Sequence, residues 1–476
     1  MTAARGRVTA LVAAVVAACV AFQLNASMLS PALVTMAREL GTDEATVGLS
    51  QTMFFTLAAM FSLFLPRLSD IAGRRRVLLG MLAVMLLGSV IAALATGVGM
   101  LFAGRILQGV TGPVVPIGLL MLRSEITDPR RYGVALGLVT AVNGGVAGLD
   151  ALAGGWLATA YGFRSIFWVI AVVTVAAIGC VAVWGTESRP SAGTRMDWRG
   201  VVPLVVAVGA LLLAFDEAGA LGDADWGLVA LYVVVAVVAG AVFAALEART
   251  VQPLVPVAFL RRRGTWATLA TTLLTMTGVF AIANGLVASL AQNTTGAGFG
   301  LPADLTALVL LAPYALVGWL VGPFAGRLAP VLGYRTVLRI GLAGSVAATV
   351  LLAVAGVASL PVLVAGTLLL GITYAGIANI MLNGLGVLLS PPENPGMLPG
   401  LNAGAFNLGA GISFVVLPAA QIAFGGSDHS AAGYTGGMIT GAVLTAAALG
   451  VSLLIPRPSA AETAPRETAV ANGRPE

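Results

Sequence analysis

Charged residues are scarce in this chain of 476 residues: they make up 9% of it, and lysine is absent. A soluble globular protein carries roughly 25% charged residues, so these residues cannot cover a water-exposed surface of this size. The scarcity excludes a soluble multidomain enzyme and a disordered chain. It also argues against a nucleic-acid partner, despite the net charge of +5. We expect the solvent of most of the chain to be a lipid bilayer.

Residues that bind metals or nucleotides are equally scarce. His429 is the single histidine, and the two cysteines, Cys19 and Cys180, lie in separate apolar runs. There is no Cys/His/Asp cluster to predict a metal site, and a phosphate-binding loop needs a lysine that the chain lacks. No Gly-x-Ser-x-Gly motif indicates a hydrolase. We therefore expect no metal, no cofactor and no enzymatic activity.

Long apolar runs are abundant instead. A bilayer core about 30 Å thick needs about 20 apolar residues per helix, and the sequence contains fourteen such runs. The runs are continuous rather than alternating, which excludes an outer-membrane barrel. We predict an all-α integral membrane protein with 14 transmembrane helices. The predicted spans are residues 9–33, 46–65, 77–96, 99–122, 133–158, 165–184, 200–215, 227–246, 266–290, 304–325, 336–356, 361–388, 400–424 and 434–455.

The arginines predict the orientation of these spans, because positive residues gather in cytoplasmic loops. With a cytoplasmic N-terminus, the opposite side holds Arg38 and Arg164 and is otherwise acidic, with Glu39, Asp43 and Glu44 among its residues. We predict a multi-pass protein of the plasma membrane with both termini in the cytoplasm. Residues 457–476 are polar and are expected to form a disordered cytoplasmic tail.

An internal repeat divides the chain. Residues 64–78 match residues 324–338 in register, and two more matches follow in the same order at nearly the same offset. This pattern pairs helix 2 with helix 10, so two extra helices separate two six-helix halves. Parallel repeats of this kind are typical of transporters that rock around a site at the midplane. The further matches are residues 104–111 with 366–373 and Asn143 with Asn407.

These boundaries predict four parts. An N-terminal six-helix bundle is expected at residues 1–186, two linker helices with cytoplasmic loops at 187–264, and a C-terminal six-helix bundle at 265–456. The tail at 457–476 completes the chain.

Two motifs carry a resemblance that covers essentially the whole chain. Residues 67–76 (RLSDIAGRRR) resemble the cytoplasmic signature of the major facilitator superfamily, and residues 104–109 (GRILQG) resemble its helix 4 motif. Residues 196–200 (MDWRG) and 253–261 (PLVPVAFLR) are similar to the fourteen-helix drug:proton antiporter branch. The resemblance implies the major-facilitator fold, two six-helix bundles plus two inserted helices, and transport by alternating access.

The sequence also departs from that branch. Pro66 and Ile71 replace the usual glycine and arginine of the first motif, and Asp150-Ala151 stands where the helix 5 motif has Gly-Pro. Asn25 is the polar residue nearest to the position where helix 1 of the branch often carries an aspartate. These departures weaken the prediction of drug efflux more than the prediction of the fold.

Asp150 and Arg105 are the predicted proton-coupling residues. A carboxylate inside the membrane costs several kcal/mol and usually marks function. Arg105 is expected about 9 Å below the outer end of helix 4 and Asp150 about 25 Å above the inner end of helix 5, so their depths are similar. We hypothesise a switchable Asp150–Arg105 pair, and the resemblance implies that Arg105 assists proton transfer. The alternative is a static salt bridge.

Asp70, Gly73 and Arg74 are the predicted conformational latch. The resemblance implies that Asp70 caps or pairs across helix ends in the outward-open state, from a cytoplasmic loop. The alternative is an arginine cluster that only fixes the orientation. Pro330 occupies the position of Asp70 in the second repeat, so the latch is expected on one side alone.

Polar residues within the spans are candidates for a substrate cavity. The best are Asn25, Gln51 and Asn143, because helices 1, 2 and 5 line the cavity in this superfamily. Each candidate could instead form hydrogen bonds between helices, and Phe54 and Phe55 are more typical of packing than of a pocket. The predicted cavity residues are Asn25, Gln51, Gln108, Asn143, Asn284, Tyr374 and Asn379.

These observations predict a proton-coupled secondary transporter of a small molecule. The branch resemblance favours drug or metabolite efflux by proton antiport. The alternative is a proton symporter that imports a polar nutrient, which the lost Gly-Pro pair and the many amide side chains favour. The expected partners are the small-molecule substrate, protons and the lipid bilayer, with the protein acting as a monomer.

Overall fold

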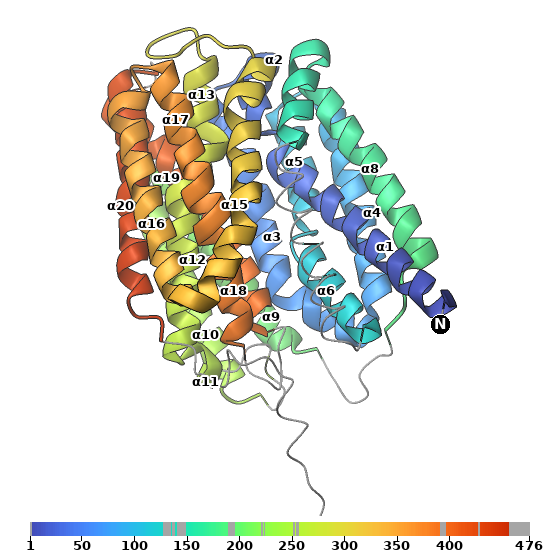
Figure 1. Cartoon of the computed structure of the whole chain (residues 1–476). Helices are drawn as coiled ribbons and strands as arrows, with labels where there is room; N and C mark the ends of the chain where they lie inside the picture. Colours follow the sequence, from blue (N-terminus) through green and yellow to red (C-terminus); the bar gives the residue numbers. More distant parts are fainter. Residues whose placement is uncertain are drawn as a thin grey trace, which may run out of the picture.

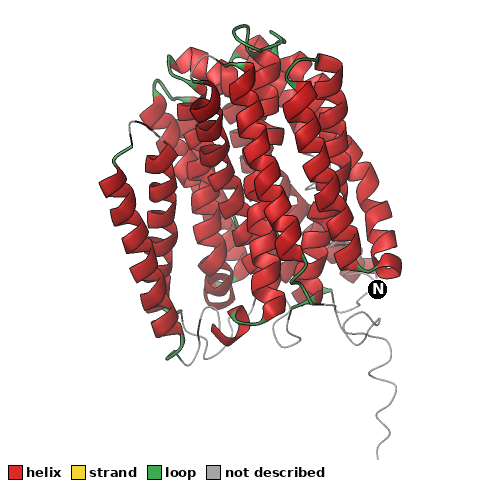
Figure 2. Ribbon diagram, turned by 90° about the vertical axis from the view of Figure 1, so that its left-hand side faces the viewer, coloured by secondary structure: helices red, strands yellow, loops and turns green. Residues whose placement is uncertain are grey.

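The computed structural model describes residues 2–126, 149–188, 196–219, 224–250, 257–390, 397–426 and 429–456, with the single residues 135, 139, 222 and 253 between them. Throughout these ranges the regular elements are helices, which run roughly parallel to one another (Figures 1 and 2). Among the described residues, thirteen helical segments are long and apolar enough to cross a membrane. The fifth predicted span, 133–158, lies mostly outside the described residues, and residues 149–161 are helical.

The first half of the chain forms one group of helices, coloured blue to teal on the right of Figure 1. Its first span covers Gly6–Leu40, longer than the predicted 9–33, because a short helical extension follows the apolar part. The elements are α1 (Thr2–Ser27), η1 (Ser30–Ala32), α2 (Leu33–Leu40), α3 (Glu44–Ala72), α4 (Arg74–Ala93), α5 (Val98–Gly109), α6 (Val114–Glu125) and α8 (Phe163–Trp184).

Two helices come between the halves in the chain, α9 (Trp198–Gly219) and α10 (Trp226–Glu247). They pack against each other, and α9 also contacts α3 and α19 (Met397–Gly425). The side chain of Asp225 caps α10 by accepting hydrogen bonds from the backbone N–H groups of Gly227 and Leu228, as expected for an aspartate at a helix start. The α9–α10 pair therefore lies beside the seam between the halves.

The second half is coloured yellow to red on the left of Figure 1. Four of its long helices contain a π-helical segment, η3 to η6, a feature that often accompanies functional sites. Its elements are α11 (Val257–Leu260), α12 (Arg263–Ala281), η3 (Ile282–Leu286), α13 (Val287–Gln292), α14 (Ala303–Thr306), η4 (Ala307–Leu311), α15 (Ala312–Leu332), α16 (Tyr334–Leu351), η5 (Leu352–Gly356), α17 (Leu360–Leu370), η6 (Gly371–Ala378), α18 (Asn379–Leu388), α19 and α20 (Ala431–Ser452).

The predicted duplication has matching local geometry in the two halves. Gly73 between α3 and α4 has φ 99°, and Gly333 between α15 and α16 has φ 87°. Both values favour glycine, and both turns consist of this one residue. In the first half α5 packs on α3 and α4, and in the second half η6 packs on α15 and α16. The repeated sequence thus forms the same turn and the same helix packing twice.

The seam between the halves is formed by α3 and α19, which pack along each other. The hydroxyl of Thr52 in α3 donates a 3.2 Å hydrogen bond to the backbone oxygen of Gly411 in α19. Gly411 has no side chain to separate the two helices here. The seam brings residues of both halves together in the middle of the molecule.

Candidate functional site

Arg105 of α5 is fully buried, with 0% of its surface exposed. Its two terminal nitrogens each lie 3.2 Å from the backbone oxygen of Asn25, and it donates to the side-chain oxygens of Gln108, at 2.7 Å, and Gln51. Its guanidinium carbon lies 4.3 Å from the ring centre of Phe54. Neutral oxygens and an aromatic face therefore surround this cation.

The network around Arg105 ties four helices of the first half together. The Gln108 amide donates to Ser89 at 3.0 Å, and the Asn25 amide donates to the backbone oxygen of Ala21 and to the sulfur of Met85. Asn25, Gln51 and Gln108 are all fully buried. In this conformation these three predicted cavity residues act as links between helices.

Asp150 lies near the end of α1, and 3% of its surface is exposed. The hydroxyl of Ser27 donates a 2.5 Å hydrogen bond to Asp150 Oδ2, and the Gln23 amide donates to the same hydroxyl at 2.9 Å. Asp150 Oδ1 has no hydrogen-bond partner among the described residues. The carboxyl group is therefore held from one side only.

Arg105 and Asp150 form no ion pair in the described part of the chain in this conformation, and their action as a switchable pair remains a prediction. The two groups attach to α1 instead, Arg105 through the backbone of Asn25 and Asp150 through Ser27. The amide oxygens of Gln51 and Gln108, instead of a carboxylate, accept hydrogen bonds from the guanidinium group. Similar depth on consecutive helices did not imply contact, because residues of α1 bind each group separately.

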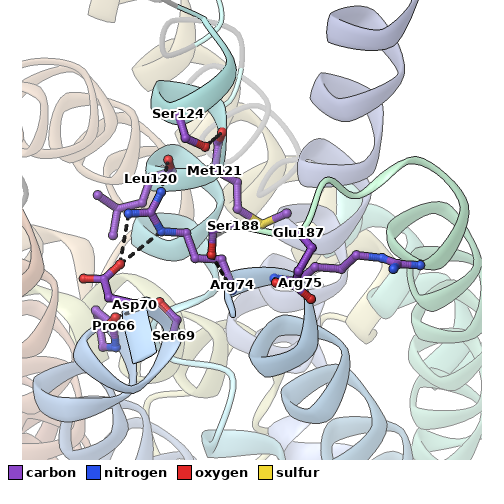
Figure 3. Close-up of polar contacts among 10 residues, drawn as sticks. All are labelled: Pro66, Ser69, Asp70, Arg74, Arg75, Leu120, Met121, Ser124, Glu187 and Ser188. Atoms are coloured by element: carbon purple, nitrogen blue, oxygen red, sulfur yellow. Dashed lines mark hydrogen bonds and ion pairs between the residues drawn. The ribbon is translucent and has the colours of Figure 1, made fainter. Parts of the chain in front are cut away.

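Asp70 and Arg74 of the predicted latch lie in helices rather than in a loop (Figure 3), and Gly73 forms the turn between them. Asp70 belongs to α3, and Arg74 is the first residue of α4. Gly73 is the single residue between the two helices. Asp70 Oδ1 accepts from Arg74 at 2.9 and 3.1 Å, and Arg74 also donates to the backbone oxygen of Leu120 at 2.8 Å. The side-chain contacts of this pair lie within the first half, so its action as a latch remains a prediction.

Two residues that sequence reasoning missed cap the start of α4. Glu187 Oε1 accepts from the backbone N–H of Arg75 at 3.2 Å, and Ser188 accepts from that of Arg74 at 3.0 Å (Figure 3). Negative charge is favourable at a helix start. A Cβ atom on Gly73 would lie 2.4 Å from Glu187 Oε1, so the glycine leaves room for this cap. The pairing joins residues more than a hundred positions apart, which no local motif reveals.

A second set of missed contacts joins the halves at the upper end of Figure 1, near α2 and α13. Glu44 Oε1 accepts from the Asn293 amide at 2.7 Å, and His429 Nε2 lies 3.8 Å from the same oxygen. The Gln292 amide donates to the backbone oxygen of Pro31 at 2.9 Å. These bonds close the end of the molecule that the sequence predicts to face outward.

The other predicted cavity residues lie in separate places. Asn284 on η3 accepts from Ser30 at 3.3 Å, across the halves. The Tyr374 hydroxyl donates to the sulfur of Met276 at 2.9 Å, and Asn379 accepts from the Asn383 amide at 3.3 Å, both within the second half. Asn143 lies outside the described residues. Asn284 is thus the cavity candidate that joins both halves.

Comparisons with known proteins extend this picture. The sequence model of the family described as Major Facilitator Superfamily matches residues 15–414. A protein of Lactococcus lactis subsp. cremoris (strain MG1363), named uridine/deoxyuridine transporter, is 49% identical over 458 residues, and the match covers 95% of each chain. The puromycin resistance protein pur8 of Streptomyces alboniger is 28% identical over 441 residues, which cover 90% of this chain and 78% of that protein.

A solved structure supports the fold. The human organic anion transporter MFSD10 superposes with a TM-score of 0.63 at 17% identity, and the match covers 94% of this chain and 99% of that one. Similarity at such low identity supports the arrangement of helices and not the substrate.

Proposed function

Because the chain belongs to the Major Facilitator Superfamily, a family of membrane transporters, we propose that it imports nucleosides of the uridine and deoxyuridine kind together with protons. The observation that carries the proposal is the 49% identity, over 95% of both chains, to a protein named as a transporter of these compounds. Relatives named for drug resistance match at lower identity, 28% in the case of puromycin resistance. The proposal therefore replaces drug efflux with its alternative, import of a polar nutrient.

The polar residues of the site favour a neutral substrate. Export of hydrophobic cations needs an acidic group that the cation can reach, but Asp150 is 3% exposed and bonded to Ser27. The other polar groups near the seam are amides and hydroxyls, such as Asn284 and Thr52. Such groups match the carbonyl, N–H and hydroxyl groups of a nucleoside.

Asp150 is the proposed proton carrier. No cationic side chain pairs with it in the described part of the chain, and a buried carboxyl group without a cation is less costly to keep neutral than charged. Ser27, its partner, lies three residues before Ser30, whose hydroxyl bonds to Asn284 of the other half. We propose that protonation of Asp150 acts on this contact between the halves, which would have to break for the outer end to open. We place both termini in the cytoplasm and propose a monomer.

Uptake by whole cells tests the proposal. A bacterial host without its own pyrimidine nucleoside uptake would express the chain or carry an empty vector, and radiolabelled uridine would be followed with and without a protonophore. We expect uptake above the vector control, competition by deoxyuridine, and loss of uptake with the protonophore. Absence of uridine uptake together with proton-dependent extrusion of ethidium would overturn the proposal in favour of drug efflux.

A further inference from the structure

Two aromatic rings face each other across the seam. Phe55 of α3 and Phe414 of α19 have ring centres 6.5 Å apart, and their planes differ by 9°. One ring comes from each half of the molecule, and both are buried. The neighbouring ring pairs of this cluster are tilted or edge-on, at 31° to 85°. Phe55 and Phe414 therefore form the parallel pair of the cluster.

The two rings lie at matching depths. Phe55 comes 11 residues after Glu44, the first residue of α3, and Phe414 comes 11 residues before Gly425, the last residue of α19. Both distances correspond to about 16 Å along a helix, which is close to the middle of a bilayer core about 30 Å thick. The internal repeat also places Phe414 at the position that Asp150 has in the first half. The pair therefore lies at the depth of the midplane site that an alternating-access transporter exposes first to one side of the membrane and then to the other.

A third aromatic ring lies edge-on to both rings of the pair, and polar residues lie nearby in the chain. Phe280 of α12 meets Phe55 at 85° and Phe414 at 80°, with ring centres 5.0 and 6.0 Å away. The Asn284 amide donates to the backbone oxygen of Phe280, so Asn284 lies one helical turn from Phe280. The buried hydroxyl of Thr56, next to Phe55, has no hydrogen-bond partner among the described residues. Thr56 is thus the chain neighbour of Phe55, and Asn284 lies one helical turn from Phe280.

We propose that Phe55 and Phe414 hold the base of the substrate between their faces, so that one planar ring bridges the two halves. This inference rests on the proposed nucleoside transport. Aromatic carbon atoms pack at about 3.5 Å, so a planar base between two parallel rings holds their faces about 7 Å apart. Separation of α3 from α19, whose two rings are already nearly parallel, would admit the base. Thr56 and Asn284 are then placed to bond its polar edge.

The test compares uridine with 5,6-dihydrouridine, whose base keeps the same carbonyl and N–H groups but is saturated and no longer flat. Uptake of each compound would be measured for the wild type, Phe55→Leu and Phe414→Leu. The control is Phe61→Leu, on the same helix, whose ring pairs with Phe64. Stacking on an aromatic side chain is worth about 1–3 kcal/mol per base, so the wild type and the control should prefer uridine by about fivefold or more. The preference should fall to within about threefold in the two Leu variants.

The preference is a ratio, so it does not depend on how much protein reaches the membrane. Phe55→Tyr and Phe414→Tyr keep an aromatic face and should keep the preference, which covers the case in which a Leu variant does not fold. An unchanged preference in Phe55→Leu and Phe414→Leu, or its loss in both Tyr variants, overturns the stacking inference while uridine transport stands. Absence of uridine uptake by the wild type overturns the proposed function itself.

Discussion

Ser27 and Asp150 are joined by a 2.5 Å hydrogen bond between α1 and the helical residues 149–161. Two residues earlier in α1, the backbone oxygen of Asn25 accepts from Arg105. The end of one helix thus holds the buried acid and the buried cation at the same time, without direct contact between them. A change in the position of this helix end would alter the surroundings of both groups together.

The first prediction concerns Asp150→Asn. The Ser27 hydroxyl can donate to an amide oxygen as it does to the carboxyl oxygen, so we expect the variant to fold. A side-chain amide cannot take up and release a proton as a carboxyl group does, so uridine accumulation against its gradient should be lost. Exchange of internal for external uridine should remain, because exchange needs no net proton movement. Uphill uptake and exchange in membrane vesicles measure the two properties separately.

The matched control is Asp304→Asn, because Asp304 bonds with Thr159 in a solvent-exposed contact. This variant should keep both activities. Uphill accumulation by Asp150→Asn at the wild-type level would show that another group carries the proton.

The second prediction concerns Arg105→Lys. An ammonium group cannot reproduce the planar contacts to Asn25, Gln51 and Gln108 while lying over Phe54. Each lost bond of this charged group costs about 1.5–3 kcal/mol. We expect a markedly lower melting temperature in detergent and at least tenfold slower uptake.

Arg164→Lys serves as the comparison, because Arg164 also lies over a ring, that of Phe163, and bonds to Glu39 and to the backbone of Ala95. Its side chain is 38% exposed, so water can replace lost bonds and the melting temperature should change little. Equal effects of the two substitutions would contradict a special role of the Arg105 network.

The third prediction concerns Gly73→Ala. The backbone of Gly73 has φ 99° and ψ 128°, a conformation that costs a residue with a side chain about 1–3 kcal/mol. The added Cβ would also displace Glu187 from the start of α4. We expect a lower melting temperature and slower uptake. Gly80→Ala, inside α4 with nothing within 4 Å of the added atom, should leave both properties unchanged or improve stability.

The fourth prediction concerns Glu44→Ala, which removes the bonds to Asn293 and His429 across the halves. The outer end should open more often, because the closed state alone has these bonds. Ser30→Cys, introduced where Cys19 and Cys180 have been replaced by serine, reports the opening through its reaction with a membrane-impermeant maleimide. Labelling should be faster in the Glu44→Ala background.

Glu39→Ala is the control for this experiment. Glu39 lies at the same end but bonds to Phe163 and Arg164 within the first half. Labelling of Ser30→Cys should stay at the wild-type rate in this background, and an equal acceleration would contradict the assignment of Glu44 to the outer closure.

The membrane spans were predictable because a bilayer constrains both length and composition. The predicted spans 165–184 and 227–246 correspond to Phe163–Trp184 and Trp226–Glu247. The predicted ends of the spans are wrong where polar residues continue a helix beyond its apolar part. Arg38 and Glu39 end the apolar run but remain helical to Leu40, and α3 continues through Pro66 and Asp70 to Ala72. Hydropathy marks the lipid contact of a helix and not its end.

The site was less predictable, because partners depend on contacts between distant residues. The polarity of Gln51 and Gln108 indicated a role. Gln108 lies within one turn of Arg105 on α5, but the bond between Gln51 and Arg105 required the packing of α3 against α5. Ser27 and Glu187 belong to residue types that are common outside functional sites, so no pattern distinguished them. Phe55 was expected to pack, and the sequence contained no signal that its ring lies parallel to that of Phe414 across the halves.

Proton movement during uridine entry tests the central claim most directly. Purified protein would be reconstituted in vesicles that contain a trapped pH-sensitive dye, without an imposed gradient, and uridine would be added outside. Symport predicts acidification of the interior that follows uridine entry and is absent in vesicles with Asp150→Asn. Uridine entry without any change in internal pH, or with alkalinisation, would contradict the account.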